Sequence, residues 1–181
     1  MQSKINRMIY IAVFAGLTAA GSIMRIPFPL VPLTLQTFFV YLAGNILRAR
    51  DAAISQIIFL LTGLSGIPVF SMGGGPGYIM KPTFGYLLAF PVAAWMAGYV
   101  SGRSSKKNGY LIGNLYAAII IFFIGSVYFY ILSNYFLDMS ISVKTVLISG
   151  VVIFIPGEIL KIISAAMLAK KLNKVLGSQS L

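Results

Sequence analysis

The chain has 181 residues, of which 59% are hydrophobic and only 9% are charged. Soluble domains carry about 25% charged residues, so this composition excludes a soluble globular domain and a disordered tail. The net charge is +11, but the bases lie in small groups between apolar runs instead of one stripe, which excludes nucleic acid as a partner.

The residue types that support most catalytic chemistry are missing. The chain has no cysteine and no histidine, which excludes disulfides, Cys/His metal sites and Ser-His or Cys-His catalysis. Its acids are Asp51, Asp138 and Glu158, too few for a carboxylate metal centre, and no phosphate-binding G-x-x-x-x-G-K-[ST] motif occurs. We therefore expect no enzyme, no cofactor and no bound metal, and another protein must supply energy for any driven process.

Six apolar segments predict about six transmembrane helices in a lipid bilayer. They cover residues 8–24, 33–47, 52–70, 83–100, 110–136 and 143–169. Long, continuously apolar runs favour helices over barrel strands, because a helix satisfies its own backbone groups in hydrocarbon. The fold class is thus all-α, a polytopic membrane protein with one domain over residues 1–181.

The basic residues predict the orientation of these segments. Ten of them fall on the side of the N-terminus, three fall on the opposite side, and Lys161 lies within the sixth segment. Because positive charge concentrates in cytoplasmic loops, both termini are expected in the cytoplasm.

The sixth segment contains the most informative polar residues. Glu158 and Lys161 follow Pro156 and are three positions apart, so they share one helix face. Charged residues within a membrane span usually face a cavity or a partner, which predicts a binding site here. Mutual neutralisation of a structural pair is the alternative.

Two loops between segments are further candidates. The stretch Gly73–Gly77 can cap a pocket with backbone amides from Gly74 and Gly75, or it is a plain re-entrant turn. Lys81 follows and is a candidate partner for an anionic group. Before the second segment, a proline-rich stretch forms either a lid or a rigid connection, and it leads to the polar side chains of Thr34 and Gln36.

The first segment has a face of small residues that predicts close approach of another helix. The partner helix is either internal or in a separate subunit. The residues are Ala12, Ala15, Gly16, Ala19 and Ala20.

The chain resembles the BioY family, the biotin-specific S components of energy-coupling factor (ECF) transporters. The matching stretches are IPFPLVPLTLQTFFVYLAG at 26–44, GLSGIPVFSMGGGPG at 63–77, KPTFGYLLAF at 81–90 and FIPGEILK at 154–161. Their order, their spacing and the six-segment layout agree over nearly the whole chain.

The resemblance implies an S-component-like helical bundle in a prokaryotic cell membrane that captures biotin from outside the cell. It also implies a transmembrane coupling protein and two cytoplasmic ATPases as partners, with the small-residue face meeting the coupling protein. The candidate substrate-binding residues are Glu158, Lys161, Gly74, Gly75, Tyr86, Gln36, Thr34 and Lys81. Transport of another small vitamin or precursor, or a role in membrane assembly without transport, are the alternatives.

The chain departs from the family pattern at three positions. It has Glu158 where members usually have Asp, and glycines at 73–75 where they often have an Asn. Leu87 stands where they often have Arg, and Lys81 is a candidate replacement for a missing polar contact.

Overall fold

The computed structural model describes residues 2–26, 31–103 and 108–176, and each of the six predicted apolar segments forms helix. The prolines at 27 and 29 lie outside the described residues. The helices are α1 Gln2–Ile23, α2 Gln36–Ile46, α3 Ala49–Leu64, α4 Phe84–Leu88, α5 Phe90–Arg103, α6 Gly109–Tyr135, α7 Val143–Gly150 and α8 Ile155–Leu176. The all-α class predicted from the long apolar segments is confirmed.

The fourth and sixth segments are each divided by a proline. Pro91 is the second residue of α5 and Pro156 is the second residue of α8. Proline lacks the backbone N–H that an interior helical position would use, but it fits the first turn, so a new helix begins at each site. A short 3₁₀ turn at Val152–Phe154 (η2) joins α7 to α8.

Within the described residues, four helical regions are long and apolar enough to cross a membrane by length and composition. They are Lys4–Ile23, Phe84–Arg103, Gly109–Tyr135 and Val143–Val175. Helices α2 and α3 have 11 and 16 residues, fewer than the roughly 20 that a full span needs. Their apolar segments are longer in sequence, but Leu33–Thr34 form strand β2 and residues 65–70 continue as a loop.

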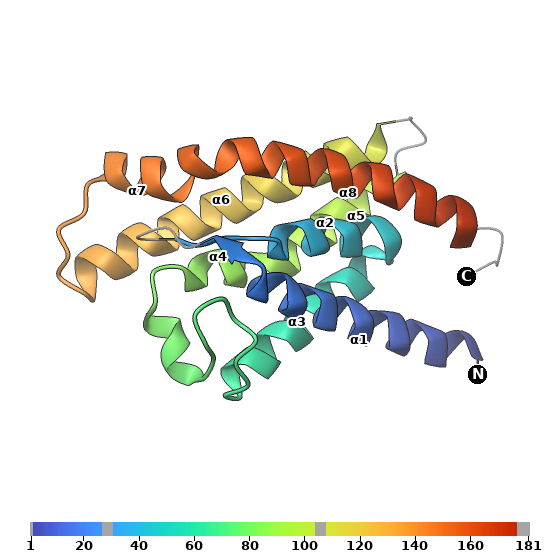
Figure 1. Cartoon of the computed structure of the whole chain (residues 1–181), viewed down its shortest axis with the longest axis horizontal. Helices are drawn as coiled ribbons and strands as arrows, with labels where there is room; N and C mark the ends of the chain where they lie inside the picture. The colour runs from blue at the N-terminus through green and yellow to red at the C-terminus, as the bar shows by residue number, and fades with distance from the viewer. Residues whose placement is uncertain (1, 27–30, 104–107, 177–181) are drawn as a thin grey trace.

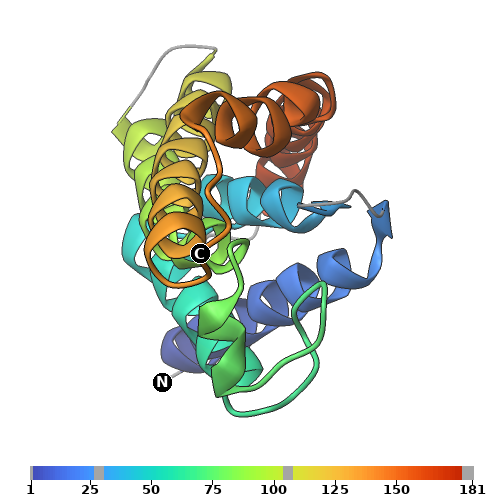
Figure 2. The ribbon, with the colours of Figure 1, turned by 90° about the vertical axis from the view of Figure 1, so that its left-hand side faces the viewer.

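Helix α5 lies at the centre of the bundle and packs against α2, α3 and α6. Small residues permit this close packing: a Cβ on Gly44 of α2 would lie 2.5 Å from the Cβ of Ala97, and one on Gly113 of α6 would lie 2.8 Å from the Ala97 carbonyl oxygen. Viewed along the bundle, α2 lies between α1 and α8 (Figure 2).

Both termini lie at one end of the bundle (Figure 1). At the opposite end, β1 (Arg25–Ile26) pairs antiparallel with β2 (Leu33–Thr34), and a long loop joins α3 to α4. This outer loop, residues 65–83, contains the 3₁₀ helix Pro76–Met80 (η1). These two connections lie, with the connection from α6 to α7, at the loop end of the molecule (Figure 1).

Near the terminal end, side-chain amides fasten α8 to its neighbours. Asn45 Nδ2 donates to Asn114 Oδ1 at 3.0 Å, and Asn114 Nδ2 donates to the Ile162 carbonyl at 3.1 Å. Asn173 Nδ2 donates to the Asn45 carbonyl at 3.1 Å and to the Tyr110 hydroxyl at 2.8 Å. This amide clamp, as we call Asn45, Asn114 and Asn173, joins α2, α6 and α8.

Candidate ligand-binding site

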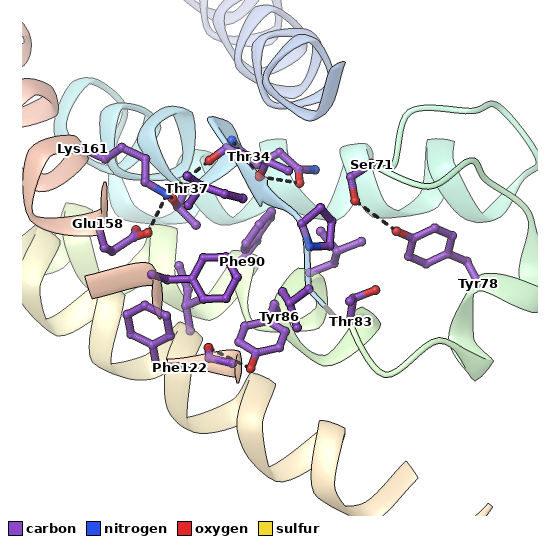
Figure 3. Close-up of a pocket in the computed structure, with 18 residues that line it drawn as sticks. Thr34, Thr37, Ser71, Tyr78, Thr83, Tyr86, Phe90, Phe122, Glu158 and Lys161 are labelled. Carbon is purple, nitrogen blue, oxygen red and sulfur yellow. Dashed lines mark hydrogen bonds and ion pairs between the residues drawn. The ribbon is translucent and has the colours of Figure 1, made fainter. Parts of the chain in front are cut away.

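A pocket lies beneath the β1–β2 hairpin and the outer loop. Most of its wall is apolar, and a few polar groups converge on it (Figure 3). The apolar lining comprises Val31, Pro32, Leu33, Leu87, Phe90, Ile121, Phe122, Gly150 and Phe154.

One end of the pocket is charged. Glu158 and Lys161 both line it, and the Lys161 Nζ lies 2.5 Å from Glu158 Oε2. Their side chains are 6% and 10% exposed, so the pair is buried. The three-residue spacing on α8 therefore places both groups on the pocket side of the helix, as predicted (Figure 3).

Lys161 has no hydrogen-bond donor left for a ligand. Besides Glu158, its Nζ donates to the Thr34 carbonyl at 3.2 Å and to Thr37 Oγ1 at 2.6 Å. An ammonium group has three N–H donors, so these three partners use them all. Lys161 therefore holds the hairpin and Glu158 in place.

Glu158, by contrast, keeps acceptor capacity. Its Oε1 accepts from the Tyr41 hydroxyl and its Oε2 accepts from Lys161. Each carboxylate oxygen has about two acceptor positions, so one on each remains open among the described residues. The buried carboxylate is suited to accept an N–H from a ligand.

Two buried polar atoms in the pocket wall have no hydrogen-bond partner among the described residues. They are Gln36 Nε2 and Thr83 Oγ1, in side chains that are 2% and 7% exposed. The amide of Gln36 is oriented by Thr34 Oγ1, which donates to Gln36 Oε1 at 3.1 Å. Because unsatisfied buried polar groups are costly, both atoms are poised for a ligand.

Tyr86 lines the pocket on the side of α6 and α7, and its hydroxyl donates to the Gly150 carbonyl at 3.0 Å. A Cβ at Gly125 would lie 2.2 Å from the ring of Tyr86, so only glycine at 125 leaves room for it. The structure thus brings together five of the predicted binding residues: Thr34, Gln36, Tyr86, Glu158 and Lys161.

The other three predicted residues do not line the pocket. The Gly75 amide donates to the Gly63 carbonyl at 2.7 Å, and a Cβ on Gly74 would lie 2.3 Å from the Ile67 carbonyl oxygen. Lys81 Nζ donates to the Met72 carbonyl at 2.9 Å. These residues shape the outer loop, whose contributions to the pocket are Ser71, Tyr78 and Thr83.

Aromatic packing holds the outer loop on the bundle. Phe70 lies 4.6 Å from Tyr78 and 5.4 Å from Phe59 of α3, between ring centroids. A Cβ on Gly63 would lie 2.0 Å from Phe70, so the absence of a side chain at Gly63 makes room for that ring. The loop is therefore an ordered wall of the pocket.

Several pocket residues were not identified from the sequence. Thr37 and Tyr41 contact the ion pair, and Ser71, Tyr78 and Thr83 line the loop side. The four-residue spacing of Thr37 and Tyr41 is a signal for one polar face of α2. The outer-loop residues have no such periodic signal.

The small residues of α1 divide between two faces. Ala12, Gly16 and Ala20 are exposed, and a Cβ on Gly16 would meet no atom within 4 Å. Ala15 is 7% exposed and Ala19 is partly buried, and both pack in the core. The face available to another subunit is therefore Ala12, Gly16 and Ala20.

The fold and pocket define a polytopic helical membrane protein with a largely apolar pocket near one end. The BioY family model matches residues 1–178. A probable biotin transporter BioY of Lysinibacillus sphaericus is 42% identical over 179 residues, covering 98% of this chain and 91% of that protein. Another from Pyrococcus horikoshii is 35% identical, covering 94% of this chain and 98% of that protein.

The structure is similar to the crystal structure of the S-component for biotin from an ECF-type ABC transporter. The TM-score is 0.83 at 27% identity, covering 96% of this chain and 93% of that chain. The chain belongs to the BioY family. The resemblance noted from the sequence motifs is thereby confirmed, and these relatives are transport proteins, not enzymes.

Proposed function

We propose that this protein is the substrate-binding subunit that captures biotin for uptake by an ECF transporter. The observation that carries the proposal is the buried Glu158 carboxylate, which lines a largely apolar pocket and retains acceptor capacity. Membership of the BioY family and the similarity to a biotin S-component support it.

The polar groups at the charged end match the ureido ring of biotin. That ring presents N–H donors and one carbonyl acceptor. Glu158 accepts from an N–H, and Gln36 Nε2, which has no partner among the described residues, donates to the carbonyl. Lys161 and Tyr41 keep the carboxylate oriented. Loss of either Glu158 or Gln36 would leave a ureido group unsatisfied in a buried site, which is costly.

The remaining pocket wall matches the rest of biotin. The thioether ring and aliphatic tail are apolar, and they pack against side chains such as Leu33, Phe90 and Phe122. Burial of apolar surface adds affinity, while the few polar groups fix the ligand's direction.

In the complete transporter, a transmembrane coupling protein and two cytoplasmic ATPases supply the energy. The exposed face Ala12, Gly16 and Ala20 permits close approach of a coupling-protein helix. Both termini lie in the cytoplasm of a prokaryotic cell, and the pocket opens toward the outside. The concentration of bases in segments on the terminal side supports this orientation.

Equilibrium binding of labelled biotin to the purified protein in detergent tests the proposal. We expect saturable binding at one site, and Gln36→Ala is expected to weaken it. Thr62→Ala, on α3 and outside the pocket lining, is the control and should bind biotin as the native chain does. Binding of a different vitamin without binding of biotin would overturn the proposal.

A further inference from the structure

The end of the pocket opposite the ion pair is lined by uncharged hydroxyl groups. Ser71, Tyr78 and Thr83 lie across the pocket from Glu158 and Lys161 (Figure 3). The hydroxyls of Ser71 and Tyr78 are 3.3 Å apart, and Thr83 Oγ1 is buried without a partner among the described residues. We call Ser71, Tyr78 and Thr83 the hydroxyl end of the pocket.

The basic residues near the loop end do not line the pocket. Lys81 Nζ lies 4.7 Å from the centre of the Tyr78 ring and is bonded to the Met72 carbonyl, while Arg25 is exposed on β1. In the amino-acid sequence, residues 27–30 (Pro-Phe-Pro-Leu) carry no charge. Among the described lining residues the single cation is Lys161, and its three donors are occupied.

This composition determines how a ligand's tail is recognised. With the ureido ring at Glu158, the tail extends toward the hydroxyl end. A lysine or arginine there would only donate hydrogen bonds, and it would favour a carboxylate strongly. A hydroxyl both donates and accepts, so it serves a carboxylate, a primary amide and an alcohol alike.

We propose that the pocket does not require a charged tail, and that the protein binds biotin derivatives ending in a primary amide or an alcohol about as well as biotin itself. The inference rests on the proposed function, because it assumes that the ureido ring occupies the charged end. It adds a ligand class: biotin derivatives of the same chain length whose tail is uncharged.

The test is competition against labelled biotin on the unmodified purified protein. The competitors are biotin, its primary carboxamide and the corresponding alcohol, biotinol. We expect the two neutral compounds to compete with less than a tenfold loss relative to biotin, because the charge-assisted hydrogen bonds lost with the carboxylate are offset by the lower cost of burying an uncharged tail. A loss of about tenfold or more would show that the site selects the charged tail, and it overturns the inference.

Two variants locate the contact. Thr83→Val, which removes the hydroxyl at similar volume, should weaken biotin and the carboxamide by similar factors. Lys81→Gln should leave the ratio of their affinities unchanged. If Lys81→Gln instead lowers the affinity for biotin alone, a cation meets the carboxylate and the inference is wrong. If neither biotin nor its derivatives bind, the proposed function fails as well, so the two failures are distinguishable.

Discussion

The buried pair Glu158 and Lys161 is explained either by ligand recognition or by mutual neutralisation, and single and double variants separate the two. Glu158→Gln leaves the ammonium group of the buried Lys161 without its carboxylate. Breaking a buried ion pair by removing one partner costs about 3–5 kcal/mol. We therefore expect a clear loss of thermal stability in detergent, together with weaker biotin binding.

The double variant Glu158→Gln/Lys161→Met removes both charges. Replacing a buried pair by well-packed apolar groups of similar volume is often neutral or stabilising. We therefore expect thermal stability to recover most of the loss, except for the hydrogen bonds that Lys161 donates to Thr34 and Thr37. Biotin binding should remain weak, because the charged acceptor is still missing. A hydrogen bond to a charged group contributes about 1.5–3 kcal/mol, which corresponds to roughly a 10- to 150-fold increase in the dissociation constant.

Titration with labelled biotin and thermal unfolding of the same preparations give both quantities. Asp51→Asn is the matched control, because Asp51 belongs to the ion pair with Arg7 at the other end of the bundle. It should leave biotin affinity unchanged. Native-like biotin affinity in the Glu158→Gln/Lys161→Met variant would refute our reasoning, since the pair would then serve stability alone.

Three further substitutions test the packing around the pocket and the surface of the bundle. Gly63→Val should displace the ring of Phe70 and weaken biotin binding. Gly77→Val is the control and should leave binding unchanged, because no atom lies within 4 Å of a Cβ at that position. Equal biotin affinities of the two variants would contradict the conclusion that the outer loop is an ordered wall of the pocket. Ala15→Leu should lower the free energy of unfolding by about 1–3 kcal/mol, because the larger side chain overpacks the core. Gly16→Leu should leave stability and biotin binding unchanged but reduce co-purification with the coupling protein. The reverse pattern would show that the face with Ala15, not the face with Gly16, contacts the coupling protein. Asn114→Ala should lower the free energy of unfolding by about 1–3 kcal/mol, because it leaves buried partners unsatisfied, and an unchanged unfolding midpoint would show that the amide clamp adds no stability.

The helices and the charged end of the pocket were predictable because their signals are local. Long apolar runs specify helices in hydrocarbon, and a three-residue spacing places Glu158 and Lys161 on one face. The residue at which α3 ends was harder to predict from the sequence. Residues 65–70 continue the apolar run, but Gly66 adopts a φ of 106° and Pro68 follows, so the backbone leaves the helix.

Contacts between distant segments were not predictable in the same way. Tyr41 donates to Glu158 across 117 positions of sequence, and by composition it is one more aromatic residue in an apolar run. Thr83 has no periodic neighbours that mark it as part of a site. The sequence analysis predicted that Gly74 and Gly75 bind the ligand. In the structure, glycine is needed at 74 because the backbone packs closely there, and at 75 because φ is positive.

The amide clamp has a consequence for the ligand at the other end of α8. The amide clamp fastens α8 to α2 and α6, and Glu158 is bonded to Lys161 and Tyr41. The Glu158 carboxylate is therefore preorganised before a ligand binds. Immobilising such a side chain on binding would cost about 0.5–1.5 kcal/mol, so a rigid anchor tightens capture by roughly two- to tenfold without a single added contact.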